Sequence, residues 1–339
     1  MRAVVLVGGF GTRLRPLTLT VPKPMLPVGH VPIIEHLIAN LVRGGITDVT
    51  LALGFKPEPF LAAFPDGTCA GAVLRYAVEP EPLDTAGAIR FAAEAAGIDD
   101  TFVVANGDVL TDLDVGALAD FHRRNGAEAT LHLTAVDDPS AFGVVALDGD
   151  GRVERFVEKP APGTAPSNLI NAGTYVLEPS VLDRIPLGQR LSIERATFPA
   201  IVADGRVFAL ATDDYWIDTG KPDLYLAANV DLLLGRRPHT VCEPVAPGAR
   251  IDAFASLDHA MVADGVVVAA GARIERSVLL AGASVDADAT VVGSVVMGHV
   301  GAGASVTDCV IGADTEVASG EHLVGIRRPD PDAPDPGAR

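Results

Sequence analysis

Residues 3–28 read AVVLVGGFGTRLRPLTLTVPKPMLPV, and this stretch sets the pattern for the first two thirds of the chain. An apolar strand, Ala3–Val7, runs directly into the glycine-rich segment GGFGTR. Three cations follow, Arg13, Arg15 and Lys23, and the prolines on both sides of Lys23 stiffen its backbone. Glycines after a strand let backbone N–H groups approach an anion or a base closely. The stretch therefore predicts a sheet whose edge binds a phosphorylated ligand.

The glycine segment differs from two common phosphate-binding motifs. GGFGTR lacks the GxGxxG spacing of dinucleotide-binding loops, and it does not end in the Gly-Lys-Ser/Thr of a Walker loop. Arg13 can bind phosphate oxygens in a bidentate manner, and Lys23 adds a mobile point charge. The alternative is a surface loop whose cations only face solvent. A dense cation cluster directly behind a buried strand favours the binding site.

The acidity of the whole chain makes this cation cluster informative. The 339 residues carry a formal net charge of -18, and 48% of them are hydrophobic. A sizeable core is therefore expected. Binding to nucleic acid or to an anionic membrane surface is disfavoured, because basic patches supply most of that attraction.

Neither a secretory signal nor a membrane span is expected. The apolar run Ala3–Val7 is too short for a signal core, and no stretch approaches the roughly 18 apolar residues of a spanning helix. Cys69, Cys242 and Cys309 lie far apart without CxxC spacing. They are typical of thiols in a reducing compartment, so we expect a cytoplasmic protein without a disulfide or zinc site.

Strand and helix patterns alternate up to about residue 235. Expected strands are 3–7, 48–53, 74–78, 101–105 and 129–136, and expected helices are 32–43, 84–96 and 115–124. This alternation predicts an α/β fold with a Rossmann-like, mainly parallel sheet covered on both faces. Ligands bind at the carboxyl ends of the strands in such sheets. Gly8-Gly9 and Asn106-Gly107-Asp108 both follow strands, so we expect both at that edge.

A different pattern begins after the polar, proline-containing segment 236–247, which we interpret as a linker. Aliphatic residues recur about every six positions, often followed by small or acidic residues: Val245, Ile251, Leu257, Val268, Ile274, Leu280, Val285, Val291, Met297, Ile311, Val317 and Leu323. Hexapeptide periodicity predicts a left-handed parallel β-helix over residues 248–326. The alternative is a valine- and alanine-rich loop, but loops this long are rare in compact proteins. Residues 327–339 are proline-rich and charged, which predicts a disordered tail.

Motifs along the chain together resemble the nucleoside-diphosphate-sugar pyrophosphorylases, which are sugar-1-phosphate nucleotidyltransferases. GGFGTRLRPLT and VPKPMLPV resemble the family signature, and the KPMLP form is similar to the mannose-1-phosphate guanylyltransferase branch. Further matches follow in order: EPLDTAGAI, NGDVL, FGVV, VEKP, INAGTYV, SIERATFP and YWIDTGKPDLY. The resemblance implies a catalytic domain over residues 1–235, and a hexapeptide-repeat C-terminus also occurs in the family. It covers nearly everything except the tail.

The resemblance implies nucleotidyl transfer, in which a sugar 1-phosphate oxygen attacks the α-phosphorus of an NTP and pyrophosphate leaves. The nucleophile is already an anion, so a general base is unnecessary. The difficulty is to bring two polyanions together and to stabilise the charge that builds at phosphorus, which cations and Mg²⁺ achieve. Two carboxylates, phosphate oxygens and waters suit Mg²⁺. The resemblance implies Asp108 and Asp218 as this metal pair.

The resemblance also implies roles for residues around this chemistry. Arg13, Lys23 and Asp108 are expected to be catalytic, with the two cations neutralising the triphosphate. Lys159 would hold the sugar phosphate, Glu158 and Asn171 would hydrogen-bond sugar hydroxyls, and the backbone at Gly143 would approach the sugar ring. The full set of expected substrate-binding residues is Leu6, Gly8, Gly9, Gly11, Thr12, Glu79, Asp84, Thr85, Gly87, Asn106, Gly107, Gly143, Glu158, Lys159, Asn171 and Asp218.

Several of these side chains also have a purely structural interpretation. Asp108 and Asp218 could be cap or turn residues, and Asn171 could be a strand-end amide. Glu158 and Lys159 could form an exposed ion pair, and Arg15 could serve only in a surface ion pair.

Glu79 bears on the choice of base. Thymidylyl members of the family carry glutamine at the corresponding position, whereas a carboxylate accepts two hydrogen bonds and matches the N1–H and N2–H₂ donors of guanine. We therefore expect GTP, with a salt bridge as the alternative role for Glu79. Asp84 replaces the glycine that is usual in the family before Thr-Ala-Gly. It could cap the following helix, and its position leaves the nucleotide and sugar preference open.

The resulting hypothesis is a Mg²⁺-dependent guanylyltransferase that acts on mannose 1-phosphate and forms homo-oligomers through the β-helix. The same chemistry with another hexose, heptose or cyclitol 1-phosphate, or with dTTP or UTP, is the first alternative. A noncatalytic subunit that binds sugar nucleotides is the second, although a mere binder need not keep both metal carboxylates. An acyltransferase with His299 as base is the remotest, because a lone histidine at a β-helix corner is usually solvated.

Overall fold

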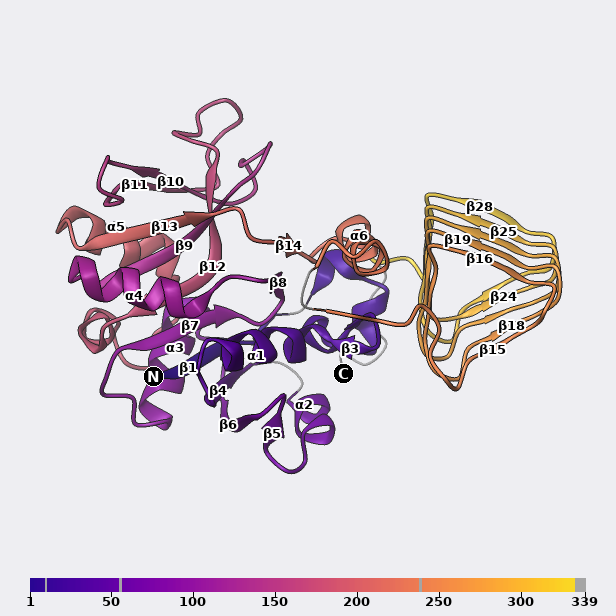
Figure 1. Ribbon diagram of the computed structural model, residues 1–339, viewed down its shortest axis with the longest axis horizontal. Helices are drawn as coiled ribbons and strands as arrows, with labels where there is room; N and C mark the ends of the chain where they lie inside the picture. The colour runs from indigo at the N-terminus through magenta and orange to yellow at the C-terminus, as the bar shows by residue number, and fades with distance from the viewer. Residues whose placement is uncertain (10, 55–56, 238–239, 333–339) are drawn as a thin grey trace. The chain divides into compact units, whose positions relative to one another are not determined.

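The computed structural model describes residues 1–9, 11–54, 57–237 and 240–332 (Figure 1). The chain forms two compact units. The sheet unit comprises Met1–Gly9 and Ile34–Trp216, and the β-helix unit comprises Phe10–Ile33 and Ile217–Arg339. The N-terminal segment with the three cations therefore groups with the last third of the chain, an arrangement that no sequence pattern indicated.

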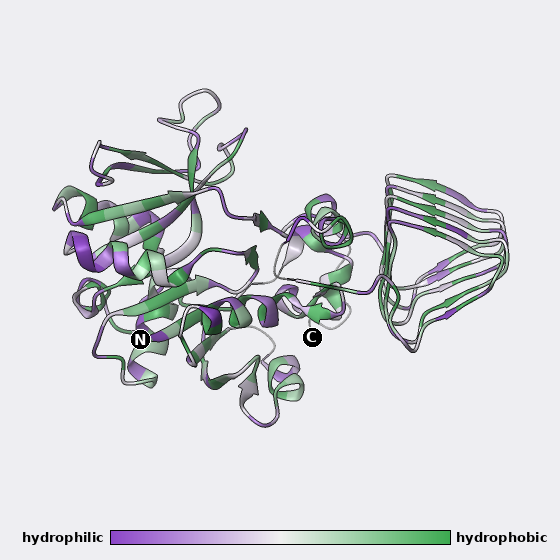
Figure 2. Cartoon of the chain, in the orientation of Figure 1, coloured by the Kyte–Doolittle hydropathy of each residue, from purple (hydrophilic) through white to green (hydrophobic). Residues whose placement is uncertain are grey.

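The sheet unit contains a ten-stranded sheet with the order β11-β10-β12-β7-β1-β4-β6-β5, in which β9 pairs with β12 and β13. Its four central strands, β7-β1-β4-β6, are all parallel. Their bounds are Arg2–Leu6 for β1, Asp48–Leu53 for β4, Ala72–Val78 for β6 and Phe102–Asn106 for β7. Strands β1, β4 and β7 read as nearly continuous apolar runs because both of their faces are buried, whereas β6 alternates buried and exposed residues. Figure 2 shows them mostly in green. The Rossmann-like, mainly parallel sheet is therefore confirmed at its centre.

The outer strands are largely antiparallel, which the alternation of strands and helices did not predict. β12 runs antiparallel to β7, β9 and β10, and β10 runs antiparallel to β11. β13 is parallel to β9. The bounds are Thr68–Cys69 for β5, Val109–Thr111 for β8, Ala129–Ala135 for β9, Gly143–Leu147 for β10, Val153–Glu158 for β11, Leu169–Leu177 for β12, Val207–Thr212 for β13 and Trp216–Asp218 for β14.

The helices expected from the sequence are present within one residue of their predicted ends. α3 buries the alanine-rich face Ala86, Ile89, Ala92 and Ala93 against β1 and β4. α4 begins where the Asp114 side chain accepts a hydrogen bond from the Ala117 N–H, and it ends at Gly126 with a left-handed φ of 55°. The bounds are Ile33–Arg43 for α1, Glu58–Ala63 for α2, Asp84–Ala95 for α3, Val115–Asn125 for α4, Phe198–Ala203 for α5 and Pro222–Leu233 for α6.

The N-terminal segment of the β-helix unit consists of short turns anchored to α6. It contains the 3₁₀ turns Thr12–Leu14, Leu17–Leu19 and Lys23–Met25 and the strands β2 (Pro27–Val28) and β3 (Val31–Pro32). The Gly29 N–H donates to Asn229 Oδ1 on α6 at 2.9 Å, and the Tyr225 hydroxyl of α6 donates to the Pro27 carbonyl. Both Tyr225 and Asn229 are fully buried. These bonds fix the segment on the helix.

The repeat region forms a parallel β-helix, as expected, with three sheets of five short strands each (Figure 1). Because every strand pairs with the equivalent strand of the next coil, aliphatic side chains stack in columns such as Leu257, Ile274, Val291, Val306 and Leu323. The first sheet contains Arg250–Ile251 (β15), Val267–Val268 (β18), Ser284–Val285 (β21), His299–Val300 (β24) and Glu316–Val317 (β27). The second contains Ser256–Asp258 (β16), Arg273–Glu275 (β19), Thr290–Val292 (β22), Ser305–Thr307 (β25) and His322–Val324 (β28). The third contains Met261–Val262 (β17), Val278–Leu279 (β20), Val295–Val296 (β23), Val310–Ile311 (β26) and Arg327–Arg328 (β29).

Strict sixfold periodicity misplaced the third column of the β-helix. Leu279 and Val296 fill its interior, rather than the predicted Leu280 and Met297. Ile274 and Leu279 both point into the interior, and they are five residues apart instead of six. The corner between the second and third sheets is therefore one residue shorter than a strict hexapeptide repeat. Val268 pairs with Val285 and Val285 with Val300, so one coil is also two residues shorter than its neighbour.

The β-helix extends further along the chain than the sequence pattern predicted. β29 pairs in parallel with β26 and places Arg327 and Arg328 in the fifth strand of the third sheet. The prediction of a disordered tail from residue 327, based on a proline-rich and charged composition, is therefore wrong for these two residues. The rest of the predicted tail lies mostly outside the described residues, as do residues 238 and 239 of the predicted linker. Among the described residues, no helix is long and apolar enough to cross a membrane.

Ile274 tests the stacked core of the β-helix. Its fully buried side chain lies between Leu257 and Val291, so Ile274→Ala should leave a cavity and lower the free energy of unfolding by about 2–5 kcal/mol. Urea unfolding followed by circular dichroism measures this change. Val324→Ala is the matched control, since Val324 is 71% exposed. Equal effects of the two substitutions would contradict the assigned interior.

Candidate active site

The carboxyl edge of the central strands collects several of the predicted residues in the sheet unit. Leu6, the last residue of β1, pairs with Asn106, the last residue of β7, so the segments that follow leave the sheet side by side. The Gly107 N–H donates to the Leu6 carbonyl at 2.8 Å. A methyl group on Gly107 would lie 2.5 Å from Val7 Cγ1, so only glycine fits this turn. The turn presents Asp108, which is half-buried, at the sheet edge.

Glu79 lies at the same edge, directly after β6. Its side chain is 9% exposed, and Oε2 accepts a hydrogen bond from the Leu83 N–H at 2.9 Å. Burial raises the pKa of this carboxyl, and the Leu83 N–H opposes that shift. A Cβ on Gly8 would be 3.9 Å from Glu79 Oε1, and one on Gly54 would be 3.6 Å from Gly8 Cα. Gly54, which follows β4, was missed because a single glycine after a strand is a weak signal.

The salt bridge considered as the alternative role of Glu79 is not observed. Within the described part of the chain, no cation lies within ion-pair distance of its carboxylate. One carboxylate oxygen, Oε2, therefore accepts from the Leu83 N–H, and the other, Oε1, lies next to Gly8 at the sheet edge.

The start of α3 explains why Asp84 departs from the family pattern. Asp84 has a left-handed φ of 60°, a conformation that glycine adopts without strain and that aspartate tolerates better than most residues. Its Oδ1 accepts a hydrogen bond from the Thr85 N–H at 2.8 Å, so it bonds the adjacent residue and does not cap the N–H groups two or three residues on. The side chain is exposed.

Thr85 and Gly87 have partners within the protein. Thr85 Oγ1 donates to Glu194 Oε2 at 2.7 Å and accepts from the Ile193 N–H at 2.9 Å. A methyl group on Gly87 would lie 2.5 Å from the Gln189 carbonyl oxygen, so this glycine allows α3 to pack closely against residues 189–191. Gly87 thus has a packing role regardless of any contact with substrate.

The predicted sugar-binding residues gather around the β10–β11 hairpin. Gly143 on β10 is paired with Glu158 on β11, and a methyl group on Gly143 would be 3.0 Å from Glu158 Oε2 and 2.7 Å from the Phe156 ring. Lys159 Nζ lies 3.7 Å from Glu158 Oε1, so the alternative ion pair is present. Lys159 has a left-handed φ of 50°. Strained backbone of this kind clusters at functional sites.

Tyr175 and Glu194 organise this part of the site, although neither of them had an expected role from the sequence alone. Asn171 Nδ2 donates to the buried Tyr175 hydroxyl at 2.8 Å, and Asn171 Oδ1 accepts from the Gly173 N–H, which fixes the amide. Burial and the neighbouring Glu194 carboxylate raise the pKa of Glu158. Tyr175 and Glu194 lie within the motifs INAGTYV and SIERATFP, where only the order of residues, not their partners, is visible.

The β-helix unit brings Arg13, Lys23 and Asp218 together across a large sequence separation. Lys23 is 5% exposed, and its Nζ lies 2.9 Å from Asp218 Oδ1. Arg13 Nη2 lies 3.7 Å from Asp218 Oδ2, while 61% of the Arg13 side chain remains exposed. The Gly220 N–H also donates to Asp218 Oδ1, so the carboxylate closes a turn and pairs with both cations. A methyl group on Gly220 would be 2.7 Å from Arg13 Nη2, which reveals a further glycine of this site.

Contacts within the loop that carries Arg13 hold its conformation. Thr18 Oγ1 donates to the Gly11 carbonyl at 2.8 Å, and a methyl group on Gly11 would lie 2.9 Å from Thr18 Cγ2. Gly11 has a φ of 57°, which favours glycine. Thr12 and Arg13 stand on the exposed turn that follows.

The predicted site is thus divided between the units. Leu6, Gly8, Gly9 and the residues from Glu79 to Asn171 belong to the sheet unit, and Gly11, Thr12, Arg13, Lys23 and Asp218 belong to the β-helix unit. The pairing of Asp108 with Asp218 therefore stays a prediction. Among the described residues, no group of three or more His, Cys, Asp or Glu side chains could by itself hold a metal ion. His299 lies outside this set and contacts Ser284 and Asp286.

Comparison with known proteins identifies relatives of both regions. Residues 2–234 match the nucleotidyl transferase family, and residues 249–332 match the GlmU-like C-terminal hexapeptide family. Over 302 residues the chain is 42% identical to a mannose-1-phosphate guanylyltransferase of Mycobacterium tuberculosis, covering 81% of this chain and 83% of the relative.

Solved structures resemble the chain over its first two thirds. A putative glucose-1-phosphate thymidylyltransferase from Bacillus anthracis, in complex with a sucrose, is 26% identical with a TM-score of 0.62, covering 68% of this chain and 94% of that chain. HddC from Yersinia pseudotuberculosis, complexed with GMP-PN, is 28% identical with a TM-score of 0.58, covering 67% of this chain and 97% of that chain.

The backbone at Asp84 can be tested through stability. Asp84→Gly should leave the melting temperature unchanged or raise it, whereas Asp84→Val should lower the free energy of unfolding by about 1–2 kcal/mol, because a β-branched residue is strained at positive φ. Asp137→Val serves as the control at an exposed position without positive φ. Equal stability of the two Asp84 variants in thermal unfolding would show that this conformation is not required.

Proposed function

Because the chain belongs to the nucleotidyl transferase family, we propose that it transfers the guanylyl group of GTP to mannose 1-phosphate and releases pyrophosphate. The observation that carries this proposal is the Lys23–Asp218–Arg13 cluster, which is a buried ammonium and an exposed guanidinium on one carboxylate. In a chain with a net charge of -18, this local concentration of cations gives anionic substrates a positive site to bind. The catalytic domain is residues 1–235 in this proposal.

The two cations have different tasks. Lys23 is buried on a proline-flanked turn, so its ammonium is a fixed charge suited to a phosphate group that approaches Asp218. Arg13 is exposed and presents a planar, bidentate donor to the triphosphate and to the leaving pyrophosphate. Both lower the repulsion between the sugar phosphate and the NTP. Their effect is largest where charge develops in the transition state.

Magnesium fits the carboxylates that flank this chemistry. Asp218 Oδ1 receives Lys23 and Gly220, whereas Oδ2 has the longer 3.7 Å contact with Arg13, so an oxygen with spare acceptor capacity is available to a cation. Asp108 would supply the second carboxylate. When bound, Mg²⁺ would neutralise phosphate oxygens and polarise the α-phosphorus.

The sugar side of the site is proposed to lie at the β10–β11 hairpin. Lys159 binds the sugar phosphate, and Glu158 and Asn171 bind hydroxyl groups. The hydrogen bonds of Asn171 to Tyr175 and Gly173 orient its amide before substrate binds, which lowers the entropy cost of binding. The sugar phosphate oxygen then attacks the α-phosphorus without a general base.

GTP is favoured over other nucleotides on two grounds. Glu79 offers a carboxylate at the nucleotide edge, which matches the paired donors of guanine. The structural relative HddC is complexed with a guanine nucleotide, GMP-PN. Because one structural relative is a putative thymidylyltransferase, dTTP is the alternative nucleotide. Another sugar 1-phosphate is the alternative acceptor. The free thiols favour a cytoplasmic location, and we propose that the β-helix supports a homo-oligomer.

Pyrophosphate release across a matrix of NTPs and sugar 1-phosphates, with Mg²⁺, tests the proposal. GTP with mannose 1-phosphate should give the highest kcat/KM, and Asp108→Asn should abolish turnover while leaving circular dichroism and the melting temperature unchanged. Asp114→Asn, at a helix cap, is the control for removal of an acidic charge. An absence of turnover with every pair would favour the alternative of a noncatalytic subunit that binds sugar nucleotides. A preference for dTTP would contradict the assignment of guanine as the base.

Glu79→Gln tests the base-recognition role. The amide can still accept from the Leu83 N–H, but its NH₂ group opposes a guanine donor, so kcat/KM for GTP should fall about 10–100-fold. Because burial raises the Glu79 pKa above its ordinary 4.5, the wild-type protein loses stability as pH rises through that range. The variant should therefore gain melting temperature relative to wild type at pH 7, and less so at pH 4.

The neighbouring exposed Glu81→Gln is the control, and it should change neither quantity. If Glu79→Gln raised the melting temperature but left kcat/KM for GTP unchanged, Glu79 would have a structural role only.

A further inference from the structure

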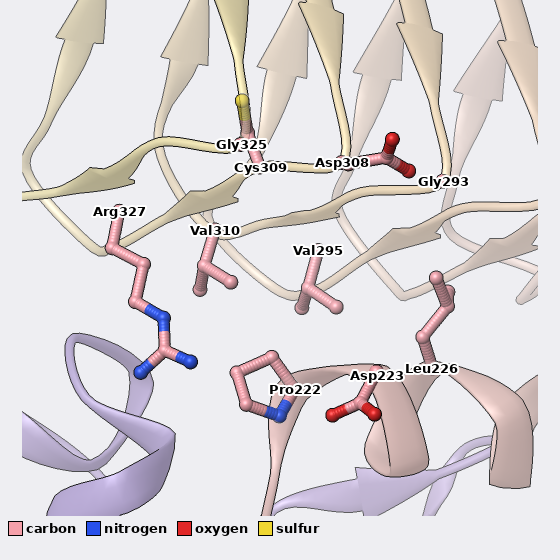
Figure 3. Close-up of a pocket in the computed structure, with 10 residues that line it drawn as sticks. All are labelled: Pro222, Asp223, Leu226, Gly293, Val295, Asp308, Cys309, Val310, Gly325 and Arg327. Atoms are coloured by element: carbon pink, nitrogen blue, oxygen red, sulfur yellow. The ribbon is translucent and has the colours of Figure 1, made fainter.

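The third sheet of the β-helix has an unusual outer face. Its outward side chains Met261, Val278, Val295 and Val310 are only 1–5% exposed, although they point away from the β-helix interior. Helix α6 packs against this sheet. Between them lies an open pocket of about 410 Å³. Figure 3 shows Val295 and Val310 on one side of it and Pro222 and Asp223 on the other. The β-helix is thus attached to the helix that also anchors the N-terminal segment.

The column of apolar residues ends at Arg327, which occupies the equivalent outward position in the last coil. Its side chain leaves the β-helix, as Figure 3 shows, and Nη1 donates a hydrogen bond to the carbonyl oxygen of Arg13 at 3.0 Å. Arg13 is the exposed cation whose guanidinium lies beside Asp218. Arg327 of the β-helix therefore bonds the main chain of the loop at Arg13, the residue proposed to bind phosphate.

A second contact supports the same loop from the preceding coil. Gly312 follows strand β26, and a methyl group there would lie 2.9 Å from Pro16 Cβ and 3.1 Å from Pro16 Cγ. The φ of Gly312 is not positive, so glycine is required here by close approach alone, chiefly to Pro16 and also to Pro329 Cδ at 3.2 Å. The backbone of this coil thus lies directly against the loop at Pro16, three residues after Arg13.

We propose that the last coil of the β-helix positions the phosphate-binding loop, and that Arg327 is the positioning residue that keeps Arg13 oriented for the phosphates of the NTP. The inference rests on the proposed function of Arg13. Bonds within the loop fix the Gly11 and Thr12 carbonyls, which accept from the Leu14 and Arg15 N–H groups. The Arg13 carbonyl instead accepts from the Arg327 guanidinium, so a donor on a rigid coil fixes the backbone at Arg13 itself. The β-helix therefore contributes to nucleotide affinity as well as to assembly.

Arg327→Met tests the proposal, because methionine preserves much of the side-chain bulk and removes the donor. The KM for the NTP should rise about three- to tenfold, the cost of one hydrogen bond, while the KM for the sugar 1-phosphate and the melting temperature stay unchanged. Arg327→Lys, which keeps a donor, should restore part of the loss. Arg273→Ala is the control, since this exposed β-helix arginine bonds only to Glu275 in the described structure.

Gly312→Ala approaches the same loop without touching Arg327. The added methyl group should displace Pro16 and raise the KM for the NTP in the same way, whereas Gly149→Ala, at a position where a methyl group meets nothing, should have no effect. An unchanged KM for the NTP in both Arg327→Met and Gly312→Ala would overturn the inference. So would an equal increase in both substrates' KM values, which would indicate general loosening.

Equilibrium binding of a fluorescent GTP analogue separates this inference from the proposed function. If the wild-type protein binds the analogue but turns over no substrate pair, the proposed catalysis fails. A three- to tenfold weaker binding to Arg327→Met, relative to wild type and Arg273→Ala, would still support the positioning role. Equal binding by all three proteins would overturn it.

Discussion

The ion pair between the buried Lys23 ammonium and Asp218 is the interaction on which the phosphate-binding part of the molecule depends. A buried ammonium is stable only when an opposite charge and hydrogen bonds compensate its lost hydration. Asp218 supplies that charge, and the turn at Gly220 fixes the carboxylate in place. The pair joins residues 195 positions apart and thereby connects the N-terminal loop to Asp218, near the end of the proposed catalytic domain. A cation held in this way is ready for an anionic ligand before the ligand arrives.

Close backbone approach is the second constraint, and it accounts for most of the glycines in the predicted site. Gly107 packs on β1, Gly143 packs on the Phe156 ring, and Gly220 leaves space for the Arg13 guanidinium. At each of these positions a single methyl group would displace neighbouring atoms. Glycines that resemble a family signature can therefore serve the packing of the site rather than contact the ligand directly. Substrate contact and packing are compatible where the backbone itself lines the site.

The β-helix shows how a repeat is fixed by stacking rather than by strict periodicity. Each aliphatic side chain packs on the equivalent side chain of the next coil, so the columns tolerate corners of different length. Where the outer face of the third sheet is also covered, two consecutive residues such as Val278 and Leu279 are both buried. Counting six residues from Ile274 and Val291 reaches Leu280 and Met297, whereas the shorter corner places Leu279 and Val296 in the interior. Strict periodicity therefore errs where a corner changes length.

The sequence by itself determined the alternation of strands and helices, the parallel centre of the sheet, the β-helix and the order of the family motifs, because each depends on local periodicity or on adjacent residues. The placement of Gly8 and Asp108 at one sheet edge also followed, since neighbouring parallel strands end together. Only the tertiary structure decided which partners the side chains have. The pairing of Lys23 with Asp218, the orientation of Asn171 by Tyr175 and the bond from Arg327 to Arg13 join residues that are distant or chemically unremarkable in the sequence. Such contacts depend on how packed elements meet in space, and no local pattern records that geometry.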